Sequence, residues 1–478
     1  MTLPDFSPDA FARTLARVQE LAVDYLRRLP EREAFRRPPD DVVRRFEAAP
    51  LPKEGEPADR ILADIERDVL PYSLGIGHPR WWGYVRASPS PFGMATDLLA
   101  TTMNNNCSGS AQIATYLEMT VVRWLAELVG YPPDAGGILL SGGSAANFVA
   151  LAAMREAKLP GTRQHGLRHL DRPPVVYVTY ETHSCIRRAV DLLGFGNDAL
   201  RLLPTDDRLR MDPAALAAAV REDRATGRLP LCVVATAGTV NLGAVDRLTE
   251  LREVARAEDL WFHIDGAYGG VLAALPELAD RYAGLADADS LAINPHKWLY
   301  VPYEAGLVLV RDRNALTRAF ATKADYLEVE EEDYFSGPLW FYQQGPQLSR
   351  AFRALKIWAV MRQIGLGGYR TLWRQDLATA AELRRLVAEH PRLELVGPSD
   401  LSIVCFRYVP AREDAQRLNR RLVDRIQKDG RLFVSGTTVN GTACLRAAIL
   451  NFRTTAADAK LAVDAVAELG AGLEAATG

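Results

Sequence analysis

The sequence predicts an α/β protein in which a mostly parallel central sheet follows a helical arm and precedes a small α+β domain. From about residue 89, short runs rich in Val, Ile and Leu alternate with helical stretches, and such runs are typical of strands buried on both faces. The length of 478 residues fits about three domains, for which we predict the boundaries 1–88, 89–366 and 367–478.

The N-terminal arm, residues 1–88, is predicted to hold two helices. Apolar residues recur at three- and four-residue steps over residues 7–29, as on one face of a helix. Prolines at 38–39 and within 50–57 interrupt this pattern, and a second helix is predicted over 58–69. Because the arm has little core of its own, we expect it to pack on another part, such as a partner subunit, and to serve dimerisation.

The central domain, residues 89–366, is predicted to contain strands at 138–140, 175–178, 231–235, 261–264, 291–293 and 306–310. An acidic cluster at 328–335 is expected to form a mobile loop, and a long helix is predicted over 348–364. In the last domain, helices alternate with strands predicted at 401–406, 432–435 and 444–450. In parallel sheets, ligands bind beyond the carboxyl ends of the strands, so we expect the ligand-binding residues just after each run.

Composition narrows the classes of function. The 57 Lys and Arg residues against 60 Asp and Glu residues give a net charge of -3, so no basic surplus points to nucleic acid. The sequence has no run of about 18 apolar residues, so we expect no membrane span, and we also expect no secretory signal. Five scattered cysteines suit free thiols in the cytoplasm. Seven histidines lack metal-type spacing, and His165 and His169 are expected in a solvated loop, so no metal site is predicted.

Two polar motifs follow the first predicted strands. Ser141-Gly142-Gly143-Ser144 opens a helix, where small residues, free N–H groups and the helix dipole could hold a phosphate, although such a motif can also be a simple turn. Thr182-His183-Ser184 follows the second strand and Thr236 ends the third. Taken alone, each is only weak evidence for a functional site.

Two charged residues end the next strands. Asp265 precedes Gly266-Ala267, where small side chains leave room for a flat ligand; the alternative is a structural ion pair. Asn294-Pro295-His296-Lys297-Trp298 contains a lysine between bulky neighbours, and partial desolvation would make it a usable amine nucleophile. An isolated lysine would otherwise be expected on the surface.

The order of these residues is more specific than any one of them. A phosphate-binding turn, an imidazole, a threonine, a carboxylate and a lysine end successive strands, as a pyridoxal 5′-phosphate site requires. In such a site the lysine forms a Schiff base, the carboxylate keeps the pyridine nitrogen protonated, and the helix terminus binds the phosphate.

The chain resembles the group II pyridoxal-phosphate decarboxylases, the family of aromatic-L-amino-acid, glutamate and histidine decarboxylases. The resemblance covers about residues 60–460 and is carried by Ser141-Gly142-Gly143-Ser144, Thr182-His183-Ser184, Asp265-Gly266-Ala267-Tyr268, Asn294-Pro295-His296-Lys297-Trp298, His78-Pro79, Phe352-Arg353-Ala354-Leu355-Lys356 and Leu445-Arg446. It implies an aspartate-aminotransferase-like fold (fold type I), a homodimer with active sites at the subunit interface, and decarboxylation of an amino acid.

The resemblance also implies roles for individual residues. Lys297 would be the Schiff-base lysine, Asp265 the partner of the pyridine nitrogen, and His183 the residue that stacks on the ring. The other implied cofactor contacts are Gly143, Ser144, Asn294 and His296 around the phosphate, Thr236 near the ring hydroxyl and Ala267 against the ring face. Trp81, Tyr84 and Arg86 fall in the segment that lines the side-chain pocket, where aromatic residues favour an aromatic substrate and Arg86 leaves an acidic one open.

The chain departs from the family pattern in the loop that carries a proton-donating tyrosine. Counting back without gaps from Phe352 puts Phe341 at that position, with Tyr342 one residue away and Tyr334 in the same loop. We predict Tyr342 as the acid. If Phe341 holds the position, the expected reaction is oxidative decarboxylation–deamination to an aldehyde, and a non-catalytic binding protein of the same fold is the alternative from another class.

Overall fold

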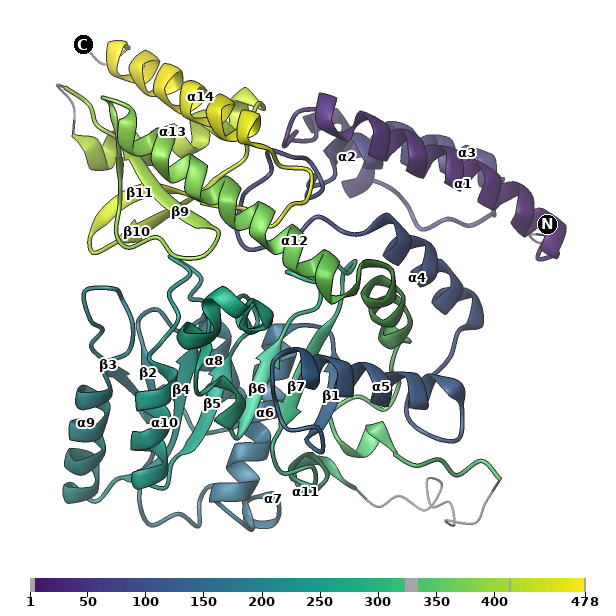
Figure 1. Ribbon diagram of the computed structural model, residues 1–478. Coiled ribbons are helices and arrows are strands. Elements are labelled where there is room, and N and C mark those ends of the chain that lie inside the picture. The colour runs from purple at the N-terminus through teal and green to yellow at the C-terminus, as the bar shows by residue number, and fades with distance from the viewer. Residues whose placement is uncertain (1–4, 323–333, 412–413, 477–478) are drawn as a thin grey trace. The chain divides into compact units, whose positions relative to one another are not determined.

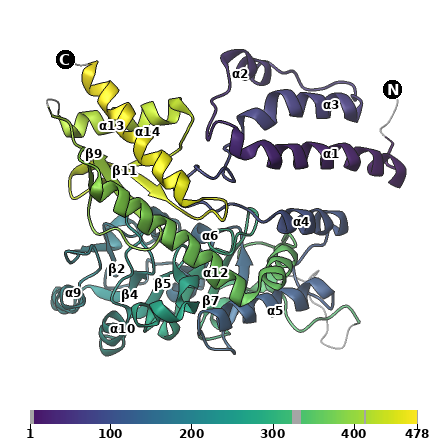
Figure 2. The same cartoon turned by 45° about the horizontal axis from the view of Figure 1, so that its top comes forward.

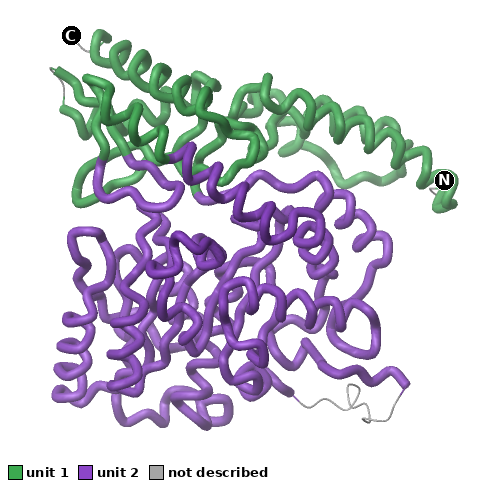
Figure 3. The backbone as a smooth tube through the Cα atoms, viewed as in Figure 1, with its two compact units in different colours: residues 1–84, 381–395, 406–478 green, residues 85–380, 396–405 purple. Residues whose placement is uncertain are grey.

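The computed structural model describes residues 5–322, 334–411 and 414–476, and residues 328–333 of the expected acidic loop lie outside them. The chain divides into two compact units (Figure 3). Unit 1 comprises residues 1–84, 381–395 and 406–478, and unit 2 comprises residues 85–380 and 396–405. The arm and the C-terminal segments therefore group together, whereas the sequence suggested separate domains with boundaries near 88 and 366.

Unit 2 is built on a seven-stranded sheet with the order β1-β7-β6-β5-β4-β2-β3 (Figure 1). Its strands are β1 (Gly136–Leu140), β2 (Pro174–Thr179), β3 (Leu200–Leu203), β4 (Leu229–Thr236), β5 (Trp261–Asp265), β6 (Ser290–Ile293) and β7 (Gly306–Val310). The pairs among β2 to β6 are parallel, while β7 is antiparallel to both β1 and β6. The mostly parallel sheet and all of its predicted strands are confirmed, and the half-exposed edge strand β3 was missed because its pattern is not continuously apolar.

Helices pack on this sheet in two groups. Helix α6 (Gly143–Lys158) packs with α8 (Ser184–Leu192) and α11 (Ala315–Phe320) and lies against β5, β6 and β7. Helices α9 (Pro213–Ala225) and α10 (Leu248–Ala257) pack together against β4. Many α6 side chains are small, which lets the helix lie close to the strands that carry the candidate site residues.

The predicted helix over 348–364 begins later and extends much further, as α12 (Arg353–Glu389). The helix is interrupted at Gly365, whose φ of +64° is accessible to glycine at little cost. Beyond this break, Tyr369 and Trp373 lie one turn apart on the same face. The indole of Trp373 donates to the carbonyl of Trp298 at 2.8 Å, and the hydroxyl of Tyr369 donates to the carbonyl of Leu299 at 3.1 Å.

Helix α12 also binds Tyr300, the next residue after Trp298 and Leu299. Tyr300, in the left-handed region at φ +54°, donates its hydroxyl to Asp376 Oδ2 at 2.8 Å. Three hydrogen bonds with α12, two donated by the helix and one accepted by it, therefore hold residues 298–300 just after Lys297. They also explain why residues 367–380 belong to unit 2 rather than to the C-terminal domain predicted from the sequence.

Unit 1 contains the arm helices α1 (Pro8–Arg28), α2 (Asp40–Glu47) and α3 (Ala58–Asp64), of which α1 and α3 were predicted. A four-stranded sheet with the order β10-β11-β9-β8 contains β8 (Leu393–Leu395), β9 (Ile403–Tyr408), β10 (Ser435–Val439) and β11 (Thr442–Ala448). Helices α13 (Ala415–Asp429) and α14 (Ala456–Ala475) accompany this sheet (Figure 1). The strand predicted over 432–435 begins only at Ser435.

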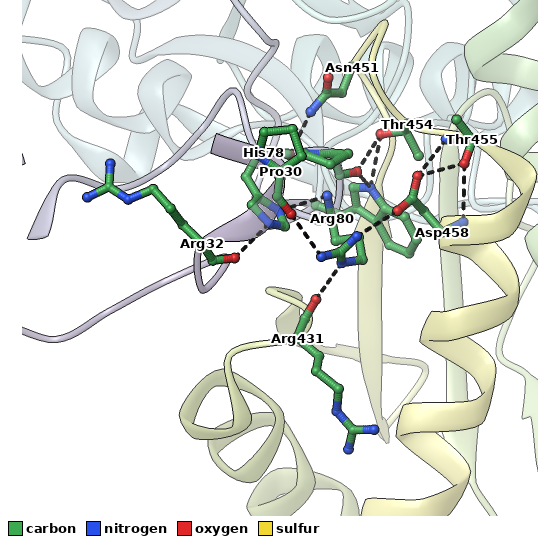
Figure 4. A network of polar contacts seen from close by, with 11 residues as sticks. Pro30, Arg32, His78, Arg80, Arg431, Asn451, Thr454, Thr455 and Asp458 are labelled. Atoms are coloured by element: carbon green, nitrogen blue, oxygen red, sulfur yellow. Dashed lines mark hydrogen bonds and ion pairs between the residues drawn. The ribbon is translucent and has the colours of Figure 1, made fainter. Parts of the chain in front are cut away.

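A polar network joins the end of the arm to the C-terminal part of unit 1 (Figure 4). The guanidinium of Arg80 donates to the carbonyl of Arg431 at 2.8 Å, to Asp458 Oδ1 at 3.0 Å and to the carbonyl of Pro30 at 3.3 Å. The amide of Asn451 donates to the carbonyl of His78 at 2.8 Å. The end of the arm thus packs on the C-terminal part of its own chain, and these contacts join the distant segments of unit 1.

Within the described part of the chain, no helix is both long and apolar enough to cross a membrane. The same residues include no group of three or more His, Cys, Asp or Glu side chains arranged to hold a metal ion.

Candidate active site

The candidate residues gather at the carboxyl edge of the unit 2 sheet. Thr236 and Asp265 are register partners at the ends of β4 and β5, and both are buried. A Cβ added to Gly143 would lie 3.0 Å from Asn294 Nδ2 and 3.2 Å from Ala267 Cβ. The residues that follow β1, β4, β5 and β6 in the sequence are thus brought together, as the parallel order requires.

Asp265 is 6% exposed at the end of β5, and its carboxylate is held by two donors. The backbone N–H of Ala267 donates to Oδ1 at 3.1 Å, and the side-chain amide of Asn147 donates to Oδ2 at 3.1 Å. These bonds fix the orientation of the carboxylate and leave lone pairs for a further donor. The sequence analysis missed Asn147, three residues after the Ser141-Gly142-Gly143-Ser144 motif, as a partner of Asp265.

Lys297 follows β6 in a tight turn in which its N–H donates to the carbonyl of Asn294 at 2.9 Å. The lysine is half-buried between the buried residues His296 and Trp298. The Trp298 ring stacks on Tyr268 with a centroid separation of 5.8 Å. The expected partial desolvation of Lys297 is therefore present, and the turn that carries the lysine is rigid.

His296 lies beside Gly142 of the Ser141-Gly142-Gly143-Ser144 motif. Its Nδ1 accepts a hydrogen bond from the N–H of Ala305 at 3.0 Å, and its ring lies 4.5 Å from that of Tyr303. Burial, reinforced by the charge of Lys297, lowers the pKa of His296 to about 3, so the ring is neutral near pH 7. A Cβ on Gly142 would lie 3.1 Å from His296 Cε1, so a side chain at Gly142 would crowd this ring.

His183 caps the N-terminus of α8. Its Nδ1 accepts from the N–H of Cys185 at 3.1 Å, which places the proton of the neutral ring on Nε2. The residue is exposed, so a face of the ring is available to a ligand. This arrangement fits the stacking role expected of His183.

The start of α6 fits a phosphate group. Among the described residues, no side chain caps the helix at Gly142, and Ser144 in the first turn is exposed. Asn294 Oδ1 is buried and has no hydrogen-bond partner within the described chain, as expected of a group that awaits a ligand or water. With the helix dipole, these groups could hold an anion such as the phosphate of pyridoxal phosphate.

The segment expected to line the substrate pocket is placed in three different surroundings. Trp81 is 1% exposed and stacks on Phe433 within unit 1, with ring centroids 5.1 Å apart. Tyr84 is exposed at a φ of +56°. Arg86 lies near Tyr303: burial raises the pKa of Tyr303, and the charge of Arg86 opposes that shift. Because the Tyr303 ring contacts that of His296, the charge of Arg86 lies in the neighbourhood of one residue expected to contact the cofactor.

The three loop candidates for the proton donor differ in burial. Phe341 is 1% exposed, and the Arg350 guanidinium lies 4.8 Å from the centre of its ring. Tyr342 is 9% exposed, and its hydroxyl accepts from the Gln343 amide at 3.2 Å. Tyr334 is fully exposed. Phe341 thus packs into the core, and the roles of the tyrosines stay predictions.

Buried histidines make the stability depend on pH. Burial lowers the pKa of His78 and His263 to about 4 each and that of His296 to about 3. An unfolded chain with histidine pKa values of about 6.5 binds more protons than the folded chain below that pH. We therefore expect the free energy of unfolding to fall as the pH drops from about 7 to 5, by up to ~1.4 kcal/mol per pH unit and histidine at the steepest. Urea titrations at several pH values test this, and an unfolding midpoint that is constant between these limits would contradict it.

Comparison with known proteins agrees with this geometry. A model of the pyridoxal-dependent decarboxylase conserved domain matches residues 39–409. The chain is 31% identical to an aromatic-L-amino-acid decarboxylase of Bacillus atrophaeus, with 91% of this chain and 90% of the relative covered. It is 33% identical to an L-2,4-diaminobutyrate decarboxylase of Rhizobium meliloti (strain 1021), covering 89% and 84%. It also resembles the crystal structure of Oryza sativa TDC with PLP and tryptamine, with a TM-score of 0.91, 27% identity, and 99% and 100% of the two chains covered.

Proposed function

The chain belongs to the pyridoxal-dependent decarboxylase family and is a pyridoxal-phosphate-dependent amino acid decarboxylase, and from this premise we propose that its substrate is an aromatic L-amino acid. The observation that carries the chemistry is the convergence of Lys297, Asp265 and the uncapped start of α6 at one sheet edge. The aromatic preference is supported by the aromatic-L-amino-acid decarboxylase among the relatives and by the tryptamine-bound structure.

In the proposed mechanism, each residue has a distinct task. Bound pyridoxal phosphate supplies an electron-withdrawing ring that takes up the electron pair left when carbon dioxide departs. We assign the covalent attachment of the cofactor to Lys297 Nζ and retention of a proton on the ring nitrogen to the Asp265 carboxylate. His183 would lie against the ring, and Gly143, Ser144, Thr236, Ala267, Asn294 and His296 would complete the cofactor contacts.

Protonation at Cα completes the reaction, in which the amino acid and one proton give the amine and carbon dioxide. We assign this proton to the hydroxyl of Tyr342. If the buried Phe341 occupies the donor position instead, no protein hydroxyl would deliver the proton. Dioxygen and water would then be the co-reactants of an oxidation that gives the aldehyde and releases carbon dioxide, ammonia and hydrogen peroxide.

A substrate panel tests this assignment. The holoenzyme is incubated in air with L-tryptophan, L-tyrosine, L-phenylalanine, L-glutamate and L-2,4-diaminobutyrate, while carbon dioxide, product mass and peroxide are measured. We expect an aromatic substrate to give equal amounts of amine and carbon dioxide, with kcat/KM at least about tenfold above the others, since the pocket contacts differ by more than one methylene. A preference for diaminobutyrate or glutamate would refute the aromatic assignment. Formation of peroxide with an aldehyde would refute the assignment of an amine as the product.

We further propose that the protein is a homodimer and that part of its interface is an apolar patch on unit 2. Helices α4 (Pro91–Met103) and α5 (Ile113–Leu128) lie on the same flank of that unit (Figures 1 and 2). They expose the apolar side chains of Phe92, Leu98, Leu99, Met103, Ile113, Tyr116 and Met119. So many exposed apolar groups on adjacent helices are typical of a surface that is covered by a partner.

Charge substitution in this patch tests the dimer. Ile113 and Leu99 are 70% and 56% exposed, so Ile113→Asp with Leu99→Asp should be tolerated by the subunit and should dissociate the dimer. Sedimentation velocity is expected to show a dimer for the wild type and a monomer for the double variant. Leu192→Asp, at another exposed apolar residue on α8, is the matched control and should stay dimeric. A monomeric wild type, or a double variant that still dimerises, would overturn the assignment of this patch.

We also propose a cytoplasmic location. The five cysteines are all free and buried, as suits a protein kept in a reducing compartment. Fractionation of the cells that produce the protein would test the location directly.

A further inference from the structure

A chain of buried side chains lies behind Asp265. His263 and Asp265 are two residues apart on β5, so their side chains share one face of the strand. Asn147, one turn into α6, lies between them: His263 Nε2 is 2.7 Å from Asn147 Oδ1, and Asn147 Nδ2 is 3.1 Å from Asp265 Oδ2. Asn147 and His263 are fully buried, although neither side chain is apolar.

The donors in this chain all point toward Asp265. The indole of Trp261 can only donate, and it donates to Ser290 Oγ at 2.8 Å. His263 Nδ1 lies 2.9 Å from the Ser290 hydroxyl and 3.2 Å from the Ser290 carbonyl. Because Nε2 faces the Asn147 carbonyl oxygen at 2.7 Å, we place the histidine proton on Nε2, so that Nδ1 accepts from the hydroxyl. His263 donates that proton to Asn147 Oδ1, and this fixes the amide so that its NH₂ group faces the carboxylate.

The protonation states of His263 and Cys185 agree with this direction of hydrogen bonding. Burial lowers the pKa of His263 to about 4, so the ring is neutral near pH 7 and needs the tautomer described above. Burial also raises the pKa of Cys185 to about 12, and this neutral thiol is the other contact of the Asn147 amide, at 3.3 Å. Asp265 is therefore held by oriented dipoles of neutral groups, which can strengthen a carboxylate's contact without supplying a competing cation.

We propose that Asn147 and His263 are positioning residues that hold the Asp265 carboxylate toward the pyridine nitrogen of the cofactor. This inference rests on the proposed role of Asp265 and adds two residues to the site. A residue that served only to fill the core would not need a complete donor chain, since an apolar side chain of the same size would do.

Two substitutions interrupt this series of hydrogen bonds at different points. Asn147→Leu keeps the approximate size and removes the donor to Asp265, while His263→Leu removes the donor that orients the amide. His263→Gln places an amide nitrogen near the former Nε2 and is expected to rescue much of the loss. Asn147→Ser serves in place of Asn147→Leu if the larger apolar side chain prevents folding.

Two controls separate positioning from stability. Asn419 in unit 1 is also a fully buried, fully hydrogen-bonded asparagine, so Asn419→Leu should destabilise the fold without touching the cofactor site. Cys185→Ala removes the other neighbour of the Asn147 amide without removing a donor to Asp265. For each variant, the dissociation constant for pyridoxal phosphate, the visible circular dichroism of the bound cofactor, kcat and the unfolding midpoint are measured.

We expect Asn147→Leu to weaken cofactor binding and lower kcat by about tenfold or more each, because a hydrogen bond to a charged group is lost. His263→Leu should act in the same direction, His263→Gln should be closer to the wild type, and Asn419→Leu should change only the unfolding midpoint. Unchanged cofactor affinity and dichroism in folded Asn147 and His263 variants would overturn the inference. A wild type that fails to bind pyridoxal phosphate would instead overturn the proposed function itself.

Discussion

Replacing Lys297 with alanine is expected to abolish decarboxylation, with a loss of kcat on the order of 10⁵-fold, as for removal of other covalent catalytic groups. The lysine is the one amine that the turn after β6 places beside the Asp265 strand end, and α12 holds that turn from Trp298 to Tyr300. The bound cofactor should also lose the visible absorption that its covalent link to the protein produces. Absorption spectra and carbon dioxide release measure the two effects.

A second lysine of unit 2 provides the control. Lys158, at the end of α6, pairs with the exposed Asp259 at 2.8 Å and lies outside the proposed site. Lys158→Ala should therefore keep its activity and absorption, and its unfolding free energy should change by no more than ~1 kcal/mol. Turnover that survives in Lys297→Ala would mean that another amine carries the cofactor.

The second large effect is expected at Asp265. Asp265→Asn keeps the shape of the side chain but removes the negative charge that retains the proton on the ring nitrogen. We expect kcat to fall by about 10²–10³-fold, the usual cost of losing a preorganised electrostatic contact, while KM changes less. Steady-state kinetics with the preferred substrate measure both quantities.

A buried carboxylate elsewhere in unit 2 is the matched control for Asp265→Asn. Asp223 is 1% exposed and accepts from the Tyr177 hydroxyl at 2.9 Å, so Asp223→Asn removes a buried charge away from the site. It should lower the unfolding midpoint but leave kcat unchanged in the folded protein. If the two variants had equal kcat values near that of the wild type, Asp265 would be a structural residue only.

Local patterns predicted most of the sheet because each parallel strand is a short, continuously apolar run. They failed where burial is partial or contacts are distant. β3 has an interrupted pattern at a sheet edge, and the arm's partners, such as Arg431 and Asp458, lie hundreds of residues away. The extent of α12 was missed because Gly365 interrupts the pattern and the helix resumes beyond it.

The site shows the same division. Asp265, Lys297 and Thr236 could be proposed from sequence because each ends or closely follows a predicted strand, and parallel strands end at one edge. Asn147 and His263 were missed, since an asparagine in a helix and a histidine in a strand do not indicate a shared role until the structure shows that their side chains are in contact. Their spacing did hold a signal: His263 precedes Asp265 by two residues and so shares its face of the strand.

Chemical trapping of the cofactor tests the central claim most directly. The holoenzyme is reduced with borohydride, which makes the link between cofactor and lysine permanent, then digested and analysed by mass spectrometry. We expect the reduced cofactor to stay on the peptide that contains Lys297. A cofactor found on a different lysine, or on none, would contradict it.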